Sequence, residues 1–268
     1  MQTRTGYAEV NGTRLYYEVA GSGAPLVLVP GFTLDTRAWE PQWGPFGERY
    51  EVVRYDRRGF GRSGPVGEAP YSHHEDLRAL LDALGAGPAA FVGHSSGGSN
   101  AVDFALAYPE STRALVLFGP LLGGYALSPG FAAAVEGLKD TARTWGPEAA
   151  KAMWTGLLDF RPAEPGAASS DFLRAIVDGY SAWHWLHDDP VRPLEPPAAG
   201  RLGELRAPTL TLLGDRDVPD CHAIVARVRE EAPRAEGVVL PGLGHLANLE
   251  APERFNAAVL AFLDRVDG

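Results

Sequence analysis

Three side chains in this sequence have the types and positions of a serine nucleophile with a supporting base and acid. The serine, Ser95, lies in Gly93-His94-Ser95-Ser96-Gly97, between a short apolar run and a segment with a helical pattern. A serine hydroxyl is a poor nucleophile until a base removes its proton, and the base works best when a carboxylate fixes its tautomer. We therefore expect a histidine and an acid close to Ser95.

The residues around Ser95 predict a cramped turn between a strand and a helix. Glycines at 93 and 97 are expected there because side chains at those positions would collide across the turn. The pattern Gly-x-Ser-x-Gly is not specific by itself, so the flanking elements have to support it. The alternative interpretation is a serine that caps an ordinary helix. His94, inside the same turn, is expected to pack away from the pocket.

Two loops downstream supply candidates for the base and the acid. In open α/β sheets the functional loops follow the carboxyl ends of the strands. Gly214-Asp215-Arg216-Asp217 follows one apolar run, and Pro241-Gly242-Leu243-Gly244-His245 follows the next. His245 is the candidate base. Asp215 and Asp217 both qualify as the acid, with Asp220 as a further choice, and a plain loop aspartate and a surface histidine are the alternatives.

The rest of the chain predicts an α/β fold with a mostly parallel twisted sheet and helices on both faces. Residues 6–19 alternate around Asn11-Gly12, which is typical of a hairpin. Apolar runs at 26–29, 51–55, 91–92, 114–118, 209–213 and 237–240 predict buried strands. Helical patterns occupy 73–84, the segment from Ser95 to Pro109, 220–232 and the segment after Pro252. Strands that alternate with helices indicate crossover connections.

The pattern changes between Gly119 and Pro197. Three helices are predicted there, at 131–145, 147–160 and 171–188, with no strand among them. We therefore expect a core formed by 1–118 and 198–268, with a helical cap inserted at 119–197.

With these pieces in place, the chain resembles the α/β-hydrolase family, in its serine-nucleophile esterase and lactonase branch with a helical cap. The matching segments are 93–97, 56–63, 214–217 and 242–250. The resemblance implies Ser95 as nucleophile, His245 as general base and then general acid, and Asp217 as the orienting acid. Within 56–63, Asp56-Arg57-Arg58 is expected to tie loops together below the site.

The resemblance also implies an oxyanion hole formed by the backbone amides of Phe32 and Ser96. Many members carry His-Gly where this chain has Pro30-Gly31. Because the donor is the amide of the next residue, we expect the hole to remain, although the contacts that hold this loop must differ.

The third predicted cap helix places Phe172, Ile176, Tyr180, Trp183 and His187 on one face. Packing within the cap is one interpretation of this face, and exposure above Ser95 is the other. Leu34 and Trp39, with Phe32, are candidates for the opposite wall of a pocket. The candidate pocket residues are Leu34, Trp39, Tyr180, Trp183, His184 and His187. Aromatic walls of this kind favour an uncharged acyl group.

Composition excludes several classes of protein. The 268 residues carry a formal net charge of −10 with no basic run, so no nucleic-acid partner is expected. No segment has the pattern of a signal peptide or a membrane span, which predicts a cytoplasmic protein with no membrane partner. The one cysteine, Cys221, is expected to be a packing residue. No metal site is predicted, because the spacing of His184 and His187 indicates cap packing. The oligomeric state is left open.

These observations predict a serine hydrolase that cleaves a carboxylic ester or lactone of a small, largely apolar substrate, without a cofactor. The same resemblance covers hydrolysis of carbon–carbon bonds, cofactor-free peroxidases and natural-product cyclases or thioesterases, and the fold does not choose among them. A serine at position 95 disfavours the dehalogenase and epoxide hydrolase branches, which need a carboxylate nucleophile. A small-molecule receptor that has kept the pocket is the non-enzymatic alternative.

Overall fold

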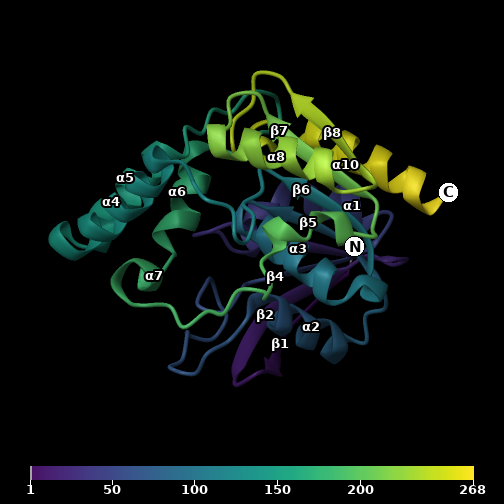
Figure 1. Cartoon of the computed structure of the whole chain (residues 1–268), viewed down its shortest axis with the longest axis horizontal. Coiled ribbons are helices and arrows are strands. Elements are labelled where there is room, and N and C mark those ends of the chain that lie inside the picture. Colours follow the sequence, from purple (N-terminus) through teal and green to yellow (C-terminus); the bar gives the residue numbers. More distant parts are fainter. Residues whose placement is uncertain (1) are drawn as a thin grey trace.

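An eight-stranded sheet runs through the centre of the molecule (Figure 1). The computed structural model of the chain describes residues 2–268. The strand order is β1-β2-β4-β3-β5-β6-β7-β8; β1, β2 and β4 pair antiparallel and the remaining pairs are parallel. The strands are β1 Thr3–Val10, β2 Thr13–Ala20, β3 Pro25–Val29, β4 Glu51–Tyr55, β5 Ala89–His94, β6 Thr112–Phe118, β7 Thr209–Gly214 and β8 Ala235–Leu240. The predicted α/β class with a mostly parallel sheet is confirmed.

Helices cover both faces of this sheet. The core helices are α1 Glu40–Gly47, α2 His73–Leu84, α3 Ser96–Ala107, α8 Pro219–Glu231, α9 Ala247–Glu250 and α10 Pro252–Asp267, with short 3₁₀ helices at Thr36–Trp39, Pro109–Ser111, Ala198–Gly200 and Leu202–Glu204. Successive side chains of a strand point to opposite faces. Accordingly, Val27 and Val29 pack with residues of α2, α3 and α8, whereas Leu26 and Leu28 pack with residues of α1 and α10. Among residues 2–268, no helix combines the length and apolar character that a bilayer crossing requires.

The sequence-based predictions for the two edges of the sheet have different outcomes. Asn11 and Gly12 have φ angles of 45° and 72°, so the predicted hairpin between β1 and β2 is confirmed. The prediction that β8 is buried is wrong, because β8 is the last strand of the sheet and leaves Val238 and Val239 38% and 51% exposed. An apolar run predicts a strand but does not reveal its place in the strand order.

The segment between β6 and β7 forms α4 Pro129–Trp145, α5 Pro147–Leu157, α6 Ser170–Asp178 and α7 Trp183–Leu186, with no strand among its described residues. Figure 1 shows these helices gathered at one side of the sheet. The prediction of one helix over 171–188 is wrong. The chain breaks between α6 and α7, where Ala182 takes a left-handed φ of 59° and Tyr180 turns inward to become 2% exposed. The common helical face predicted through Tyr180 and His187 therefore does not exist, and the cap boundaries remain a prediction.

Buried polar contacts hold the loop after β4 against the core. Asp56 accepts hydrogen bonds from the backbone amides of Thr36 and Arg62, each at 2.7 Å. Arg58 donates to both carboxylate oxygens of Asp76 at 2.8 Å, and these two side chains are 4% and 3% exposed. The loop is thereby tied to α2 and held at the carboxyl edge of the sheet.

Asp76→Ala should destabilise the fold, because it leaves the Arg58 guanidinium buried without a carboxylate. We expect the free energy of unfolding to fall by about 3–5 kcal/mol. Asp82→Ala is the matched control on the same helix, since it breaks the solvent-exposed pair with Arg78 and should cost about 0.5 kcal/mol or less. Urea denaturation measures both variants, and equal losses would contradict the role assigned to the buried pair.

Candidate active site

Ser95 lies directly after β5 in a backbone conformation that neither strands nor helices use. Its φ of 53° and ψ of −120° are strained for a residue with a side chain. A Cβ atom on Gly93 would lie 2.7 Å from the Gly97 carbonyl oxygen, and one on Gly97 would overlap the Val29 carbonyl oxygen. The predicted strand, cramped turn and helix around Ser95 are therefore present, and both glycines are required by close backbone contacts.

The strained turn is held by hydrogen bonds on both sides of the serine. The Ser95 amide donates to the Phe118 carbonyl at 3.0 Å, and the Ser95 carbonyl accepts from the amides of Gly98 and Leu121 at 2.9 and 3.0 Å. The side chain is left free of these contacts at the start of α3, and the residue is 9% exposed. The fold thus presents the hydroxyl while its backbone is fixed.

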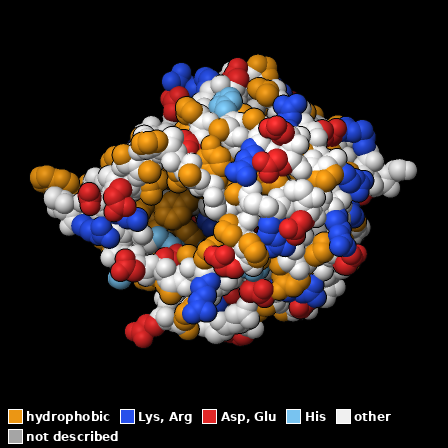
Figure 2. Space-filling model, in the orientation of Figure 1, with side chains coloured by type: hydrophobic (Ala, Val, Ile, Leu, Met, Phe, Trp, Pro, Cys, Tyr) orange, Lys and Arg blue, Asp and Glu red, His pale blue; other side chains and the backbone are white. Residues whose placement is uncertain are grey.

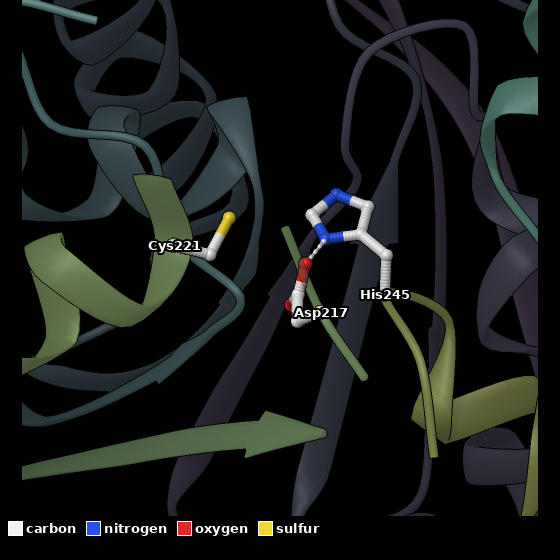
Figure 3. A group of neighbouring side chains, drawn as sticks. All are labelled: Asp217, Cys221 and His245. Carbon is white, nitrogen blue, oxygen red and sulfur yellow. Dashed lines mark hydrogen bonds and ion pairs between the residues drawn. The ribbon is translucent and has the colours of Figure 1, made fainter. Parts of the chain in front are cut away.

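His245 and Asp217 form a hydrogen-bonded pair (Figure 3). His245 Nδ1 lies 2.8 Å from Asp217 Oδ1, which also accepts from the Val218 amide at 2.7 Å. The competing acids have other partners. Asp215 accepts from the Gly242 amide, and Asp220 accepts from the amide and hydroxyl of Ser128. Of the three acids considered from the sequence, the structure brings only Asp217 to His245.

The pair changes the acidity of both groups. Burial disfavours the charged imidazolium, but the Asp217 carboxylate and its hydrogen bond outweigh burial and raise the pKa of His245 above its ordinary value of 6.5. Burial likewise opposes the Asp217 carboxylate, and the partner His245 outweighs it, so the pKa of Asp217 is lowered. The ring is therefore a stronger base than an isolated histidine.

The serine and this pair occupy the same edge of the sheet. Gly119 follows Phe118, which accepts the Ser95 amide, and a Cβ on Gly119 would lie 2.7 Å from Asp217 Oδ2 and 3.0 Å from His245 Nδ1. His94 Nε2 is hydrogen-bonded to the His245 carbonyl at 2.9 Å. Loops after β5, β7 and β8 thus converge, and His94 is a support between two of them.

Two backbone amides beside Ser95 have no acceptor among residues 2–268, those of Phe32 and Ser96. A Cβ on Gly31 would lie 3.3 Å from the Ser95 Cβ, so the loop that carries Phe32 passes close to the serine. Arg57 Nη2 donates to the Gly31 carbonyl at 2.9 Å and to Ser96 Oγ at 3.2 Å. Arg57 therefore holds the loop in which Pro30-Gly31 departs from the common His-Gly.

A cavity of about 450 Å³ opens beside Phe32 and Ser96, which both form part of its wall. Figure 2 shows the molecule hollowed where the cap meets the core, with hydrophobic side chains gathered inside the hollow. The apolar part of the cavity wall includes Phe32, Phe60, Leu121, Leu122 and Tyr125; the polar part includes Arg57, His73, His74, Ser96, Ser99, Asn100, Asp103, His184, Asp189 and Arg192. The expectation of an apolar, aromatic-lined pocket describes only part of this wall, because charged and polar side chains share it. A second hollow, of about 580 Å³, lies near Leu106 and Arg234, away from Ser95.

Of the six pocket residues predicted from sequence, the structure places His184 in the cavity wall. Tyr180 packs behind the wall, against Phe32 and Phe60. The other four predictions are corrected by their surroundings. Leu34 packs among apolar residues of α6 and the α9 region. Trp39 is 1% exposed and packs in the core against Phe255. Trp183 and His187 stack on each other outside the cavity, with their ring centroids 5.0 Å apart.

Several polar wall residues were missed by sequence reasoning. Asn100 and Asp103 lie four and seven residues after Ser96, a helical spacing that places them on the same face of α3 and was a usable signal. Arg57 lies inside the recognised 56–63 segment, but nothing in the segment distinguishes its role from that of Arg58. Asp189 comes from the irregular segment between α7 and the 3₁₀ helix at Ala198–Gly200, where no sequence pattern marks it.

Asp217, Cys221 and His245 also have possible metal-ligand atoms within 4.8 Å of one another (Figure 3). The donor set does not suit a metal. His245 Nδ1 is already engaged by Asp217, and Cys221 Sγ donates to the Gly119 carbonyl at 3.4 Å. Burial, reinforced by the Asp217 charge, raises the pKa of the Cys221 thiol, so the thiolate that binds metals is disfavoured. The cysteine packs with Leu213 and Val225.

Comparison with known proteins identifies the class. A model of the alpha/beta hydrolase family matches residues 26–258, and the chain belongs to this family. A candidate carbamate hydrolase of Azorhizobium caulinodans is 29% identical over 97% of this chain and 99% of its own length. A 2-hydroxy-6-oxo-6-phenylhexa-2,4-dienoate hydrolase of Burkholderia cepacia is 30% identical over 93% of this chain and 91% of its own. The solved structure of an N-acyl homoserine lactone degrading enzyme is 25% identical and has a TM-score of 0.74 over 96% of this chain and 100% of that chain.

Gly119→Ala should lower the pKa of His245, because the new methyl group would collide with both members of the His245–Asp217 pair and separate them. Gly119 also has a φ of 46°, which alanine rarely adopts. Gly123→Ala is the matched control, since its methyl group would meet its nearest neighbour, Asp103, at 3.4 Å. NMR titration of the imidazole C–H resonances measures the pKa, and an unchanged value in Gly119→Ala would mean that the pair does not set it.

Proposed function

We propose that this enzyme is a serine hydrolase that cleaves a carboxylic ester or lactone of a small molecule through an acyl-enzyme. The observation that carries the proposal is the strained turn at Ser95, placed at the same sheet edge as the hydrogen-bonded His245–Asp217 pair. Ser95 is the nucleophile, His245 the general base and then acid, and Asp217 the group that orients the ring.

In the proposed reaction each of these groups has a defined role. Asp217 occupies His245 Nδ1, which leaves Nε2 to take the Ser95 proton as Oγ attacks the substrate carbonyl. The tetrahedral oxyanion accepts hydrogen bonds from the free amides of Phe32 and Ser96, and a donor of this kind typically contributes about 10² to 10³ in rate. His245 then gives the proton to the leaving alcohol. Water, activated by the same ring, hydrolyses the acyl-enzyme and regenerates Ser95.

The raised pKa of His245 has a consequence for this cycle. The ring acts as a base only when it is unprotonated, so kcat/KM falls as pH drops through that pKa. Once the ring has taken the proton, the Asp217 carboxylate stabilises the imidazolium, which lowers the energy of the tetrahedral intermediate.

Ser95→Ala should abolish the hydrolysis of short aryl esters. We expect kcat/KM to fall by about 10⁴-fold or more, because no other group can form the acyl-enzyme. Ser170→Ala, at an exposed serine of α6, is the control and should retain the wild-type rate. Labelling with a fluorophosphonate, followed by peptide mass analysis, should place the adduct on Ser95. Unchanged hydrolysis in Ser95→Ala would sink the proposal.

Hydrolysis of a carbon–carbon bond is the second candidate function, and the name of the Burkholderia cepacia relative favours it. The same serine, base and oxyanion donors would serve that reaction. Wild-type enzyme should be offered short aryl esters, a β-diketone, and peroxide with halide. We expect the esters to give the highest kcat/KM. Faster turnover of the β-diketone would assign the second function, and halide oxidation would assign a peroxidase.

A further inference from the structure

The cavity lies on the acyl side of the proposed reaction. Both residues that supply the oxyanion donors, Phe32 and Ser96, are in its wall, whereas His245 is not. The leaving alcohol must stay next to His245 to receive its proton. The acyl part therefore extends away from His245 and into the cavity, so the chemistry of the cavity wall selects the acyl group.

A buried, unpaired guanidinium forms part of that wall. Three arginines among residues 2–268 are buried, and two of them have carboxylate partners: Arg54 pairs with Glu18 and Arg58 with Asp76. Arg57 is 3% exposed, and no carboxylate oxygen lies within 4.0 Å of its guanidinium. Its hydrogen-bond partners are neutral oxygens, and its Nε has no acceptor. Because arginine remains charged in proteins, the cavity contains an uncompensated cation.

A second unpartnered donor points to the same kind of ligand. The Tyr180 hydroxyl accepts from the His184 amide at 3.2 Å and lies 2.9 Å from His184 Nδ1. In the tautomer in which the hydroxyl donates to Nδ1, the hydrogen of the neutral ring is on Nε2. That nitrogen is buried without a hydrogen-bond partner, and the nearest carboxylate oxygen, from Asp189, is 3.8 Å away. Arg57 Cζ and the His184 ring centroid each lie 4.4 Å from the centroid of the Phe60 ring, so both groups pack on this side chain of the cavity wall.

The carboxylates of the cavity do not take the place of a ligand at Arg57. Asp103 lies seven residues beyond Ser96 in α3, about 10 Å along the helix axis. Asp189 is held by the Tyr71 hydroxyl and the Val191 amide, at 3.3 and 3.1 Å. Asp103 is therefore remote from the oxyanion donors, and Asp189, which lies 3.8 Å from His184 Nε2, is already engaged by Tyr71 and Val191.

We infer that Arg57, with His184, binds a carboxylate on the acyl part of the substrate, so that the enzyme acts on monoesters of short dicarboxylic acids. This inference rests on the proposed esterase function and specifies its substrate class. A buried guanidinium that already orients Gly31 and Ser96 places the bound carboxylate a short acyl chain away from the reacting carbonyl.

The test compares two esters of the same shape. Monoethyl glutarate ends in a negatively charged carboxylate, and ethyl 5-methylhexanoate ends in a neutral isopropyl group. Wild-type enzyme should prefer the anionic ester in kcat/KM. Arg57→Gln should reduce the ratio of the two kcat/KM values by about 10- to 100-fold, which is the size expected for a lost charge-assisted hydrogen bond. Arg57→Lys, which keeps the charge without the planar fork, should give an intermediate ratio.

Arg174→Gln is the matched control, because it removes an exposed arginine of α6 that is not in the cavity wall and should change the ratio by less than about 3-fold. A purely structural Arg57, one that only holds the oxyanion loop, would lower both kcat/KM values equally and leave the ratio unchanged. That result, or a wild-type preference for the neutral ester, would overturn the inference.

A binding experiment keeps the inference separate from the proposed function. If wild-type enzyme cleaves neither ester, the esterase proposal fails, but calorimetry on Ser95→Ala still measures affinity for monoethyl glutarate without turnover. Adding Arg57→Gln to that variant should weaken binding by about 10-fold or more, whereas adding Arg174→Gln should not. Equal affinity with and without Arg57 would refute the carboxylate site.

Discussion

The positive φ angle of Ser95 is the constraint on which the site depends. A side chain in this conformation is costly, and the surrounding backbone maintains it through the Phe118 carbonyl and the amides of Gly98 and Leu121. The two flanking glycines allow α3 to begin within contact distance of β3 and β5. Any change that relaxed this turn would move the hydroxyl, the Ser96 amide and the start of α3 together.

Burial of charge divides the polar residues around this turn into two groups. Arg58 and Asp76 pair with each other, and Asp56 accepts from two backbone amides, which is typical of residues that fix a loop. Arg57 keeps a donor without an acceptor, although it belongs to the same run of sequence. An unsatisfied buried donor is destabilising in the free protein, and a ligand that accepts its hydrogen bond removes the penalty.

Much of the fold and the candidate pair followed from the sequence, because both depend on local patterns. Apolar runs and turn residues predicted each strand of the sheet, and the loops after two of them contained Asp217 and His245. The cap was harder to predict. Helical periodicity through Tyr180 and His187 predicted one helix, but burial of Tyr180 against Phe32 and Phe60 is a tertiary contact that breaks it. Trp39 and Arg57 show the same limit of sequence-based prediction. The type of a residue does not reveal whether its side chain lies in the core or in the wall of a cavity.

The position of the cap between β6 and β7 separates two kinds of evolutionary change. Its helices α4 to α7 share no strand pairing with the sheet. Gly119, at the start of the segment, donates to the Leu212 carbonyl of β7, and Val191 forms an isolated bridge with Tyr71. Substitutions from α4 to α7 therefore change the cavity wall, for example at His184, without disturbing the register of the strands that precede Ser95, Asp217 and His245. Changes in the shape and charge of the cavity can thus accumulate in the insertion while the sheet edge at Ser95, Asp217 and His245 stays the same.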